Sequence, residues 1–509
     1  MVFPQIGLLS KSQKASDGFI LFHPNSSFNT FLIDKEGELI NQWAGDRFPG
    51  RSVYLLEDGN LLRTGDAENS NFSAGGRGGY IEIVDWNGNL VWNYSLSNFQ
   101  ECHHHDVQFL PNGNILAIIW VRITRDEAVA NGRNPALIDE YLWSESIIEF
   151  KPVGKSSIEE VWRWNVWDHL VQDFDSTKAN YGDVETNFRK IDLNLTRGSD
   201  FDPTDWLHFN AIDYNAELDQ IVISSPFINE IWVIDHSTTP MEAQGSTGGN
   251  SGMGGGLLFR WGNPTNYLSD TDMQRAFYGQ HNPEWLKINN QWKISIFNNG
   301  SGREEEFSTV ELIDLPINGQ GLYELDVTGR FLPLEPSFVY QREGFYSRII
   351  SGAQFIEENQ FIVCEGVEGR FFEVDRVTDE VVWEYVNPIN DTFNCSKDQA
   401  EISSNAVFRA YQYSNDYSGI LNMEPQGQLQ DLGCPLLSNV SEVEDQLNYD
   451  GNSFYFTNQS EGLWSIYNMS GQLLSSQFGS SISGLGLEGV LILHYQNNSI
   501  HIQKKFFLQ

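Results

Sequence analysis

The chain has 509 residues, of which 40% are hydrophobic and 13% aromatic, a composition typical of a globular protein with a large core and more than one domain. Its 69 acidic and 31 basic residues give a formal net charge of -38, which argues against a nucleic-acid partner because such proteins carry a basic stripe. No apolar run approaches the ~18 residues of a membrane-spanning helix, so we expect no membrane span.

The start of the chain and its cysteines bear on the compartment. Met1–Lys14 lacks the charged start, apolar stretch and cleavage site of a secretory signal, so we expect a cytoplasmic chain or one whose leader has been removed. The four cysteines show no CxxC spacing, which argues against a zinc site. Cys102 stands apart, Cys364 reads as a buried strand residue, and Cys395 and Cys434 lie in a loop-rich region where they could pair.

A repeated hairpin runs along most of the chain. Two apolar runs flank a polar turn such as Asn-Gly or Asp-Gly, which predicts paired antiparallel strands. The clearest copies are Arg51–Leu62, His104–Leu116, Leu207–Ser224, Gln280–Asn298 and Ile349–Cys364. A second hairpin, with Asp before its turn and Trp after it, follows several of them, as in Gly79–Trp92 and Gly369–Trp383. Four short strands per repeat are typical of a propeller blade, and by comparison with such repeats we count about six.

These patterns predict an all-β chain with two domains. Residues 1–435 are expected to form a six-bladed β-propeller. Residues 436–509 differ in pattern and are expected to form a small β-sandwich from short strands in Asn452–Asn458, Leu463–Gln477 and Gly489–Leu508.

Histidines mark the beginnings of three inner strands. Five of the ten histidines lie there: His103, His104, His105, His208 and His281. Equivalent positions of a repeat converge on the propeller axis, so we expect these side chains to share one site. A neutral imidazole such as that of His281 is a competent nucleophile toward acyl, phosphoryl or sulfuryl centres without a metal, the alternative being a histidine bonded in the channel wall.

The neighbouring polar residues are candidates for binding an anion. His208 and Asn210 are two apart, so strand geometry places both on one face, where they either stabilise negative charge or bridge strands. His104 and His105 alternate, so only one of them faces the axis, and the sequence does not choose between them. A metal held by three histidines is an alternative, but no carboxylate-rich spacing supports it, so we expect neither a metal nor another cofactor.

The segment from Trp164 to Val184 is long and aromatic for a propeller loop. It is interpreted either as a lid or wall for an aromatic substrate or as a packed structural loop.

Taken together, several of these segments resemble the bacterial arylsulfotransferases, which move a sulfuryl group between phenols without a nucleotide donor. The resemblance covers about Ile6 to Ala410. Its most specific pieces are His104–Val107 with Leu110–Asn114, Trp167–Val184, His208–Asn215, Ile231–Ser237, Arg260–Pro264 and Gly279–His281.

The resemblance implies a six-bladed propeller whose site lies at the central channel. It implies that His281 is a nucleophile that becomes a sulfohistidine in a ping-pong cycle, with aryl sulfates and phenols as the small-molecule partners. His208, Asn210 and one of His104 and His105 would hold the sulfuryl oxygens and assist proton transfer. The family commonly places an arginine where this chain has Pro226, a loss that should weaken charge stabilisation unless Arg348 or Arg370 substitutes for it.

The tail resembles the C-terminal sorting domain of type IX secretion in Bacteroidota. The matching pieces are Trp464–Leu474, Gly484-Leu485, Gly489–His494 and Lys504-Lys505. This resemblance implies an exported protein, periplasmic, at the cell surface or secreted, that meets the secretion machinery through this domain and whose signal peptide is missing from the chain. A homodimer is compatible with these expectations.

Two other functions compete with the transferase. One is a secreted binding propeller that has lost activity together with the arginine. The other is a quinoprotein dehydrogenase, which shares the tryptophan-rich propeller pattern but which we discount because no paired cysteines or acidic metal cluster is evident.

Overall fold

The computed structural model describes residues 6–197, 202–268, 273–319, 321–390 and 404–429 and, further on, residues 447–449, 453–456, 462–468, 473–483, 489–496 and 501–508. The chain divides into two compact units, one of residues 1–392 with 398–428 and the other of residues 393–397 with 429–509. Cys102 and Cys364 are buried free thiols, whereas Cys395 and Cys434 lie outside the described residues. Within the described part, no helix is both long and apolar enough to cross a membrane.

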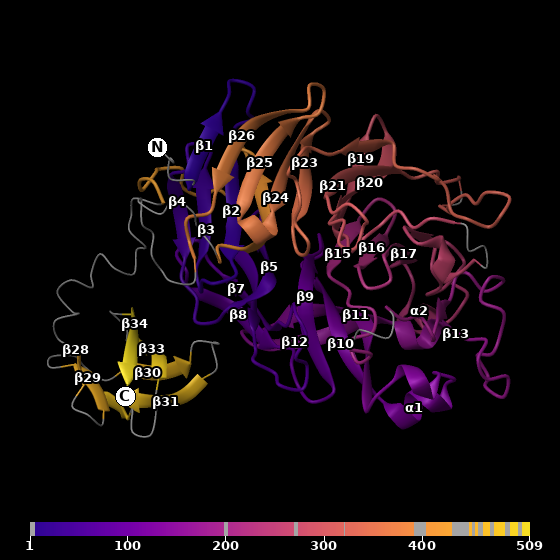
Figure 1. Ribbon diagram of the computed structural model, residues 1–509, viewed down its shortest axis with the longest axis horizontal. Helices are drawn as coiled ribbons and strands as arrows, with labels where there is room; N and C mark the ends of the chain where they lie inside the picture. The colour runs from indigo at the N-terminus through magenta and orange to yellow at the C-terminus, as the bar shows by residue number, and fades with distance from the viewer. Residues whose placement is uncertain are drawn as a thin grey trace. The chain divides into compact units, whose positions relative to one another are not determined.

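Six antiparallel sheets of the first unit follow one another around a ring in chain order (Figure 1). This arrangement confirms the predicted all-β propeller with six blades. The blades, each given from its innermost strand outward, are as follows. The first has β27 (Val407–Tyr413), β2 (Phe19–Pro24), β3 (Thr30–Asp34) and β4 (Leu39–Trp43); the second β5 (Pro49–Leu55), β6 (Leu61–Asp66), β7 (Gly79–Val84) and β8 (Leu90–Ser95); the third β9 (Glu101–Phe109), β10 (Ile115–Thr124), β11 (Tyr141–Val153) and β12 (Ser157–Asn165).

The remaining blades continue the same pattern. The fourth has β15 (Ala211–Asn215), β16 (Gln220–Ser225), β17 (Glu230–Asp235) and β18 (Phe259–Trp261); the fifth β19 (His281–Ile288), β20 (Gln291–Asn298), β21 (Thr309–Asp314) and β22 (Phe338–Tyr340); the sixth β23 (Gly352–Glu357), β24 (Gln360–Glu365), β25 (Arg370–Asp375), β26 (Glu380–Val386) and β1 (Gly7–Lys11). The connections carry α1 (Arg125–Ala130), η1 (Pro135–Leu137), η2 (Val166–His169), the pair β13 (Leu170–Val171) and β14 (Ile191–Asp192), α2 (Pro240–Ala243), η3 (Pro264–Asn266) and η4 (Gly366–Glu368).

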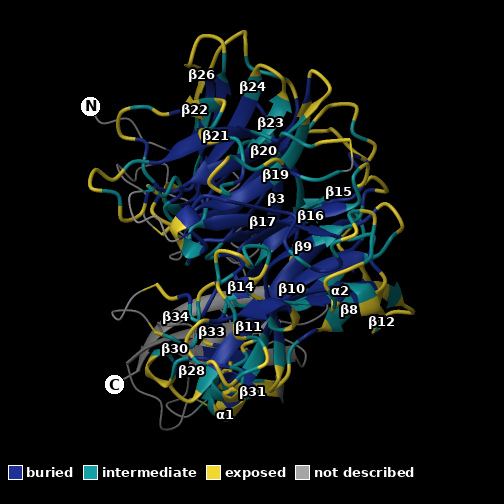
Figure 2. Ribbon diagram, turned by 90° about the vertical axis from the view of Figure 1, so that its right-hand side faces the viewer, coloured by how far each residue is buried: buried dark blue, intermediate teal, exposed yellow. Residues whose placement is uncertain are grey.

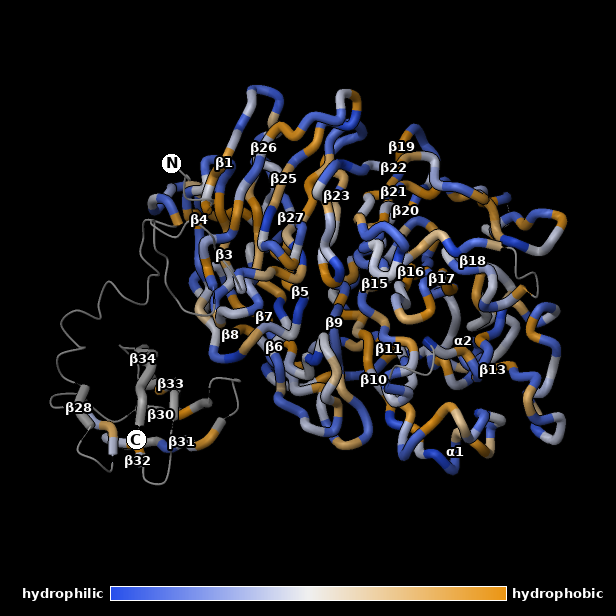
Figure 3. The backbone as a smooth tube through the Cα atoms, in the orientation of Figure 1, coloured by the Kyte–Doolittle hydropathy of each residue, from blue (hydrophilic) through white to orange (hydrophobic). Residues whose placement is uncertain are grey.

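Both ends of the propeller chain close the ring. Strand β27 pairs with β2 and so completes the first blade from its inner edge. Strand β1 pairs with β26 and extends the sixth blade at its outer edge. The blades pack through apolar strand faces, which are buried in Figure 2 and orange in Figure 3, whereas the hairpin turns are exposed and hydrophilic.

Tryptophans of the outer strands join five of the six blades to the next one. Nε1 of Trp43 donates to the Asp85 backbone oxygen at 3.0 Å, and Nε1 of Trp383 donates to that of Lys35 at 2.8 Å. Trp92 and Trp261 donate in the same way to the backbone oxygens of Ser157 and Pro333, whereas Trp162 donates to the Thr238 hydroxyl. The recurrent Trp of the outer hairpin therefore holds neighbouring blades together, and Trp383 joins the last blade to the first.

The backbone turns into the left-handed region where each inner strand begins. The residues with positive φ at this point are Arg51 (106°), His105 (53°), His208 (55°), Asn282 (54°), Ile350 (52°), Ser351 (85°) and Ser404 (59°), so the sixth blade has two and every other blade has one. Positive φ is uncommon outside glycine and costs about 1–3 kcal/mol, and such residues concentrate at functional sites. The repeat thus places at least one strained residue per blade around the axis.

The second unit contains two antiparallel sheets. One has β28 (Leu447–Tyr449), β29 (Ser453–Phe456) and β32 (Ser481–Ser483); the other has β31 (Leu473–Gly479), β30 (Gly462–Asn468), β33 (Gly489–Gln496) and β34 (His501–Leu508). The small sandwich over residues 436–509 remains a prediction.

Candidate active site

A cavity of about 770 Å³ lies among the starts of the inner strands. Its walls include histidines, arginines, glycines and several apolar side chains. The lining residues are Asn25, Arg51, Gly75, Gly76, His105, Arg197, His208, Pro226, Phe227, Asn229, Arg275, Gly279, His281, Ser301, Gly302, Arg348, Ile349, Ile350, Val367, Ala406 and Phe408. Three of the histidines singled out in the sequence therefore meet in one cavity, and the volume suits a small aromatic molecule.

Of the two adjacent histidines, His105 lines the cavity and His104 lies behind it. Their Nδ1 atoms are 2.8 Å apart, and Nε2 of His104 lies 2.8 Å from the Glu145 carboxylate. His104 also stacks on Trp120, with ring centroids 3.9 Å apart. The result is a chain of hydrogen bonds from the buried Glu145 through His104 to the imidazole in the cavity.

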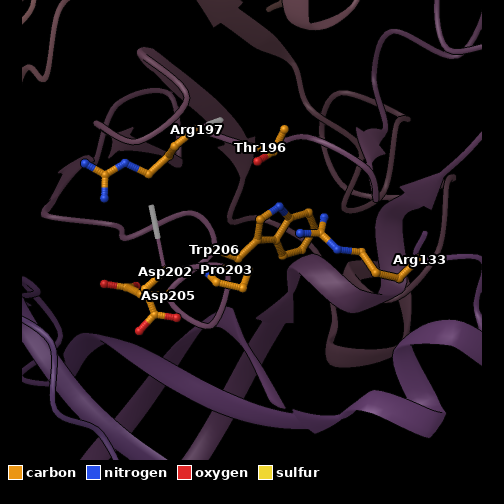
Figure 4. A pocket seen from close by; sticks show the side chains of 7 residues that line it. All are labelled: Arg133, Thr196, Arg197, Asp202, Pro203, Asp205 and Trp206. Atoms are coloured by element: carbon orange, nitrogen blue, oxygen red, sulfur yellow. The ribbon is translucent and has the colours of Figure 1, made fainter. Parts of the chain in front are cut away.

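His208 is oriented by an acidic and an aromatic neighbour. Its Nδ1 lies 2.5 Å from Asp205, and its ring stacks on Phe227 with centroids 4.1 Å apart. The guanidinium of Arg197 lies over the Phe227 ring, 3.3 Å from the ring centroid. Arg197 and Asp205 also line a small adjoining cavity (Figure 4). The ring of His208 lies 4.6 Å from that of His105, so the two can bind one small group together.

The tautomer of His281 is fixed by its neighbours. Nδ1 lies 2.7 Å from Oδ1 of Asn299 and 3.0 Å from the Gly279 backbone oxygen. The amide nitrogen of Asn299 donates to the backbone oxygens of Ser347 and Ile350, so its Oδ1 must act as the acceptor. Nδ1 of His281 therefore carries the proton, and Nε2 keeps the lone pair that a nucleophile needs.

Burial keeps the imidazoles of His104, His105 and His281 neutral. It lowers the pKa of His281 to about 3, the largest effect being loss of water around the ring. Burial, followed by the charge of His208, lowers the pKa of His104 and His105 well below the ordinary value. Burial also raises the pKa of Glu145 well above that of a free carboxyl. The lone pair on His281 is therefore available at neutral pH.

Asn210 lies outside the cavity lining and connects segments instead. Its Nδ2 donates to the Gln280 backbone oxygen at 2.9 Å, and its own backbone oxygen accepts from Arg409 at 2.7 Å. Arg409 in turn pairs with the buried Asp106 at 2.6 Å. The period-two argument that placed Asn210 beside His208 does not apply here, because the left-handed backbone at His208 interrupts the alternation. Asn210 thus ties the His208 segment to the one that carries His281.

Positive charge gathers in the cavity of an acidic protein. Arg51, Arg197, Arg275 and Arg348 line it, and none of the described residues that line it is a carboxylate. Arg370, the other candidate replacement for the absent arginine, instead pairs with Glu365 and Glu384 away from this lining. Pro226 itself lines the cavity. A local field of this sign favours anions against the net charge of -38.

A metal centre does not emerge from the part of the chain that the structure describes. No group of three His, Cys, Asp or Glu side chains there could hold an ion. The histidines face arginines and aromatic rings, which suits an anionic ligand.

Residues 164–172 of the aromatic segment are mostly buried and pack into the propeller, residues 173–184 are largely exposed, and no residue of the segment lines the cavity. Nε1 of Trp164 donates to the Gly255 backbone oxygen, and His169 bonds to that of Ala243. Of the two interpretations, the structure favours the packed loop.

Three residues that orient the histidines were not identified from the sequence. Glu145, Asp205 and Asn299 each orient a histidine, but Glu145 and Asn299 come from strands or turns far from it in sequence. Asp205 stands three residues before His208, and that short spacing is the one signal that could have revealed it.

Comparisons with known proteins identify one matching family. The model of one family, described as Arylsulfotransferase (ASST), matches residues 8–409. No curated protein matches the chain. Among solved structures, a protein of unknown function from Bacteroides caccae is 10% identical, with 78% of this chain and 99% of that one covered and a TM-score of 0.40. A putative 6-phosphogluconolactonase from Bacteroides fragilis is 11% identical, with 79% and 99% covered and a TM-score of 0.36. The Cps50 (Swd1) beta-propeller domain of Myceliophteria thermophila is 9% identical, with 76% and 90% covered and a TM-score of 0.35.

Proposed function

Because the chain belongs to the arylsulfotransferase family, we propose that it moves a sulfuryl group from an aryl sulfate to a phenol by a ping-pong mechanism through a sulfohistidine at His281. The observation that carries this proposal is the hydrogen bonding of His281. With Nδ1 held as a donor by Asn299 and Gly279, Nε2 is the ring nitrogen left with a lone pair.

In the first half of the reaction, Nε2 of His281 attacks the sulfur of the aryl sulfate. The N–S bond forms while the bond between sulfur and the aryl oxygen breaks, and the departing oxygen takes a proton. The ring gains positive charge as it is sulfated, which strengthens the hydrogen bond from Nδ1 to Asn299. His105, His208 and the cavity arginines hold the sulfuryl oxygens in this proposal, which is supported by their lining the same cavity.

The chain of hydrogen bonds through His104 is suited to proton transfer in both halves. If Glu145 is protonated, each member donates to the next and His105 presents an N–H that can protonate a leaving phenolate. If Glu145 is ionised, the bonds reverse and His105 presents a lone pair that can accept the proton of the attacking phenol. In that second half the phenol oxygen bonds to sulfur, the N–S bond breaks and His281 is regenerated.

Apolar side chains supply the surface that an aryl ring requires. Phe227, Ile349 and Phe408 line the same cavity as the histidines. Phe408 lies between two of them, with its ring centroid 6.0 Å from that of His105 and 6.4 Å from that of His281. Edge and offset contacts at such distances favour aromatic donors and acceptors.

Transfer from p-nitrophenyl sulfate to phenol tests the proposal. Wild-type protein should release nitrophenolate, and protein quenched after donor alone should gain the mass of one sulfuryl group. His281→Ala should lose both signals, whereas His236→Ala, which removes a histidine bonded to Glu149 and Asp219 outside the cavity, should keep them. Binding of aryl sulfates by wild-type protein without turnover or mass gain would instead favour the inactive binding propeller.

We further propose that residues 436–509 direct export through type IX secretion. The support is the resemblance of Trp464–Leu474 and Gly489–His494, whose described residues lie on strands β30, β31 and β33. In a host that has this machinery, deletion of residues 436–509 should retain the propeller inside the cell, and unchanged export would contradict the proposal.

A further inference from the structure

The second and third blades begin with the same irregularity of the inner strand. In β9, residues 104–106 lie between Val107, which pairs with Ala117, and His103, which pairs with Ile119, so three residues face the single Ile118. In β5, residues 50–52 lie between Pro49, which pairs with Gly65, and Val53, which pairs with Arg63, so three residues face Thr64. Bulges of this kind re-aim side chains and are common beside active sites.

Arg51 therefore occupies in the second blade the position that His105 occupies in the third. Each is the middle residue of its bulge, each precedes the paired valine by two residues, and each has a positive φ, 106° for Arg51 and 53° for His105. Both line the same cavity. The repeat thus presents Arg51 to the cavity from the blade next to a histidine that binds there.

Among the described residues, no carboxylate pairs with the guanidinium of Arg51. The acidic group that acts on it electrostatically is Asp66, whose carboxylate is already bound at both oxygens by Arg77, at 2.7 and 2.6 Å. Among the described residues, Arg51 takes part in no ion pair, whereas Arg63, Arg77, Arg260, Arg370 and Arg409 each have one. An arginine that is held in a strained backbone conformation beside a cavity, and that lacks a protein anion, is suited to an anion from outside.

We propose that Arg51 binds the oxygens of the sulfuryl group and so takes over the charge stabilisation that the absent arginine at Pro226 would supply. This inference rests on the proposed transferase function for its ligand. Its physical basis is the position of Arg51 beside His105, together with the planar donor geometry that lets guanidinium bind two oxygens of one tetrahedral anion. Arg348 lines the cavity as well but is exposed and lies outside such a bulge.

The experiment measures the affinity for inorganic sulfate by calorimetry at constant ionic strength, in parallel with kcat/KM for p-nitrophenyl sulfate. Arg51→Gly should weaken sulfate binding at least tenfold, and kcat/KM should fall by at least as much. The variant should fold with an unchanged or higher Tm, since glycine adopts a φ of 106° without strain. Arg51→Lys, which keeps the charge but offers no planar pair of donors, should recover only part of the loss.

Two control variants test whether the loss of sulfate affinity comes from the relief of backbone strain or from the change in net charge. Asp379→Gly relieves a left-handed residue in an exposed hairpin, and Arg370→Gln removes a positive charge outside the cavity; neither should change sulfate affinity more than about twofold. Sulfate affinity that is unchanged in Arg51→Gly, or wild-type protein that binds no sulfate, would overturn the assignment even if transfer occurs. If wild-type protein binds sulfate through Arg51 but never turns over an aryl sulfate, the assignment of Arg51 is supported and the proposed transferase activity is contradicted.

Discussion

A β-carbon placed on Gly76 would lie 1.9 Å from both Cε1 and Nε2 of His105. No side chain fits in that space, so only glycine at this position leaves the Cε1–Nε2 edge of the imidazole undisturbed. Gly76 also has a φ of 81°, which glycine adopts readily.

Gly76→Ala should therefore displace His105 and lower the rate of transfer by roughly a hundredfold, the effect expected of a misplacement of about 1 Å. Gly88→Ala is the matched control because Gly88 has a φ of 82° and no atom within 4 Å of an added β-carbon. Both variants should lose about 1–2 kcal/mol of stability through the strained backbone, but only the first should lose activity. Equal activities would show that the contact with His105 has no functional weight.

Asn299→Ala should slow the sulfation of His281. The hydrogen bond from Nδ1 to Asn299 becomes charge-assisted in the transition state, and its loss should cost about 1.5–3 kcal/mol, or roughly 10–100-fold in rate. Single-turnover release of nitrophenolate measures this step.

Asn299→Asp keeps the acceptor and adds a negative charge, so it should raise the pKa of His281 from the value near 3 that burial imposes. The acidic limb of the rate profile should move to higher pH in this variant. A pH profile identical to that of the wild type would indicate that Asn299 does not act through the imidazole.

Glu145→Gln should affect poor leaving groups more than good ones. If the carboxyl supplies protons through His104, its loss should slow transfer from phenyl sulfate by roughly a hundredfold and transfer from p-nitrophenyl sulfate far less, since nitrophenolate needs no proton to leave. Glu149→Gln is the matched control, because Glu149 lies four residues on along β11 and bonds to His236. Equal slowing with both donors would argue against proton transfer.

Glu284 gives the stability a pH dependence. It lines a second cavity of about 230 Å³, where burial raises its pKa to about 8 from an ordinary 4.5. The folded state therefore binds the proton more tightly than the unfolded state, so this contribution to stability is full below about pH 4.5 and is lost as the pH rises through about 8.

Glu284→Gln, which mimics the protonated side chain, should have the wild-type Tm at pH 5 and exceed it by about 2–4 °C at pH 9. The exposed Glu159→Gln should show no such trend. A Glu284→Gln protein that is no more stable than wild type at pH 9 would contradict the raised pKa.

The propeller could be predicted from the sequence because its turns and alternating runs are local signals. Asn-Gly turns such as that after Pro111 and the tryptophan after each outer turn depend on a few neighbouring residues. The meeting of His105, His208 and His281 followed from the repeat itself, since residues at equivalent places in a ring converge.

The remaining details of the site depend on backbone features that break the regular alternation of side chains between the two faces of a strand. The bulge around His105 and the left-handed backbone at His208 change which side chains face the axis, so period-two reasoning left His104 and His105 undecided and put Asn210 beside His208. Arg51 went unrecognised as a site residue for the same reason. Glu145 and Asn299 reach their histidines only after the blades have assembled.

Strand β27, which closes the ring, determines when the cavity can first be completed during synthesis. Strand β27 brings Phe408 into the cavity wall and Arg409 to Asp106, although both residues come near the end of the propeller chain. During synthesis the three histidines emerge well before them. A nascent propeller therefore holds an unfinished pocket, and no catalysis should begin until roughly the last tenth of its length has left the ribosome.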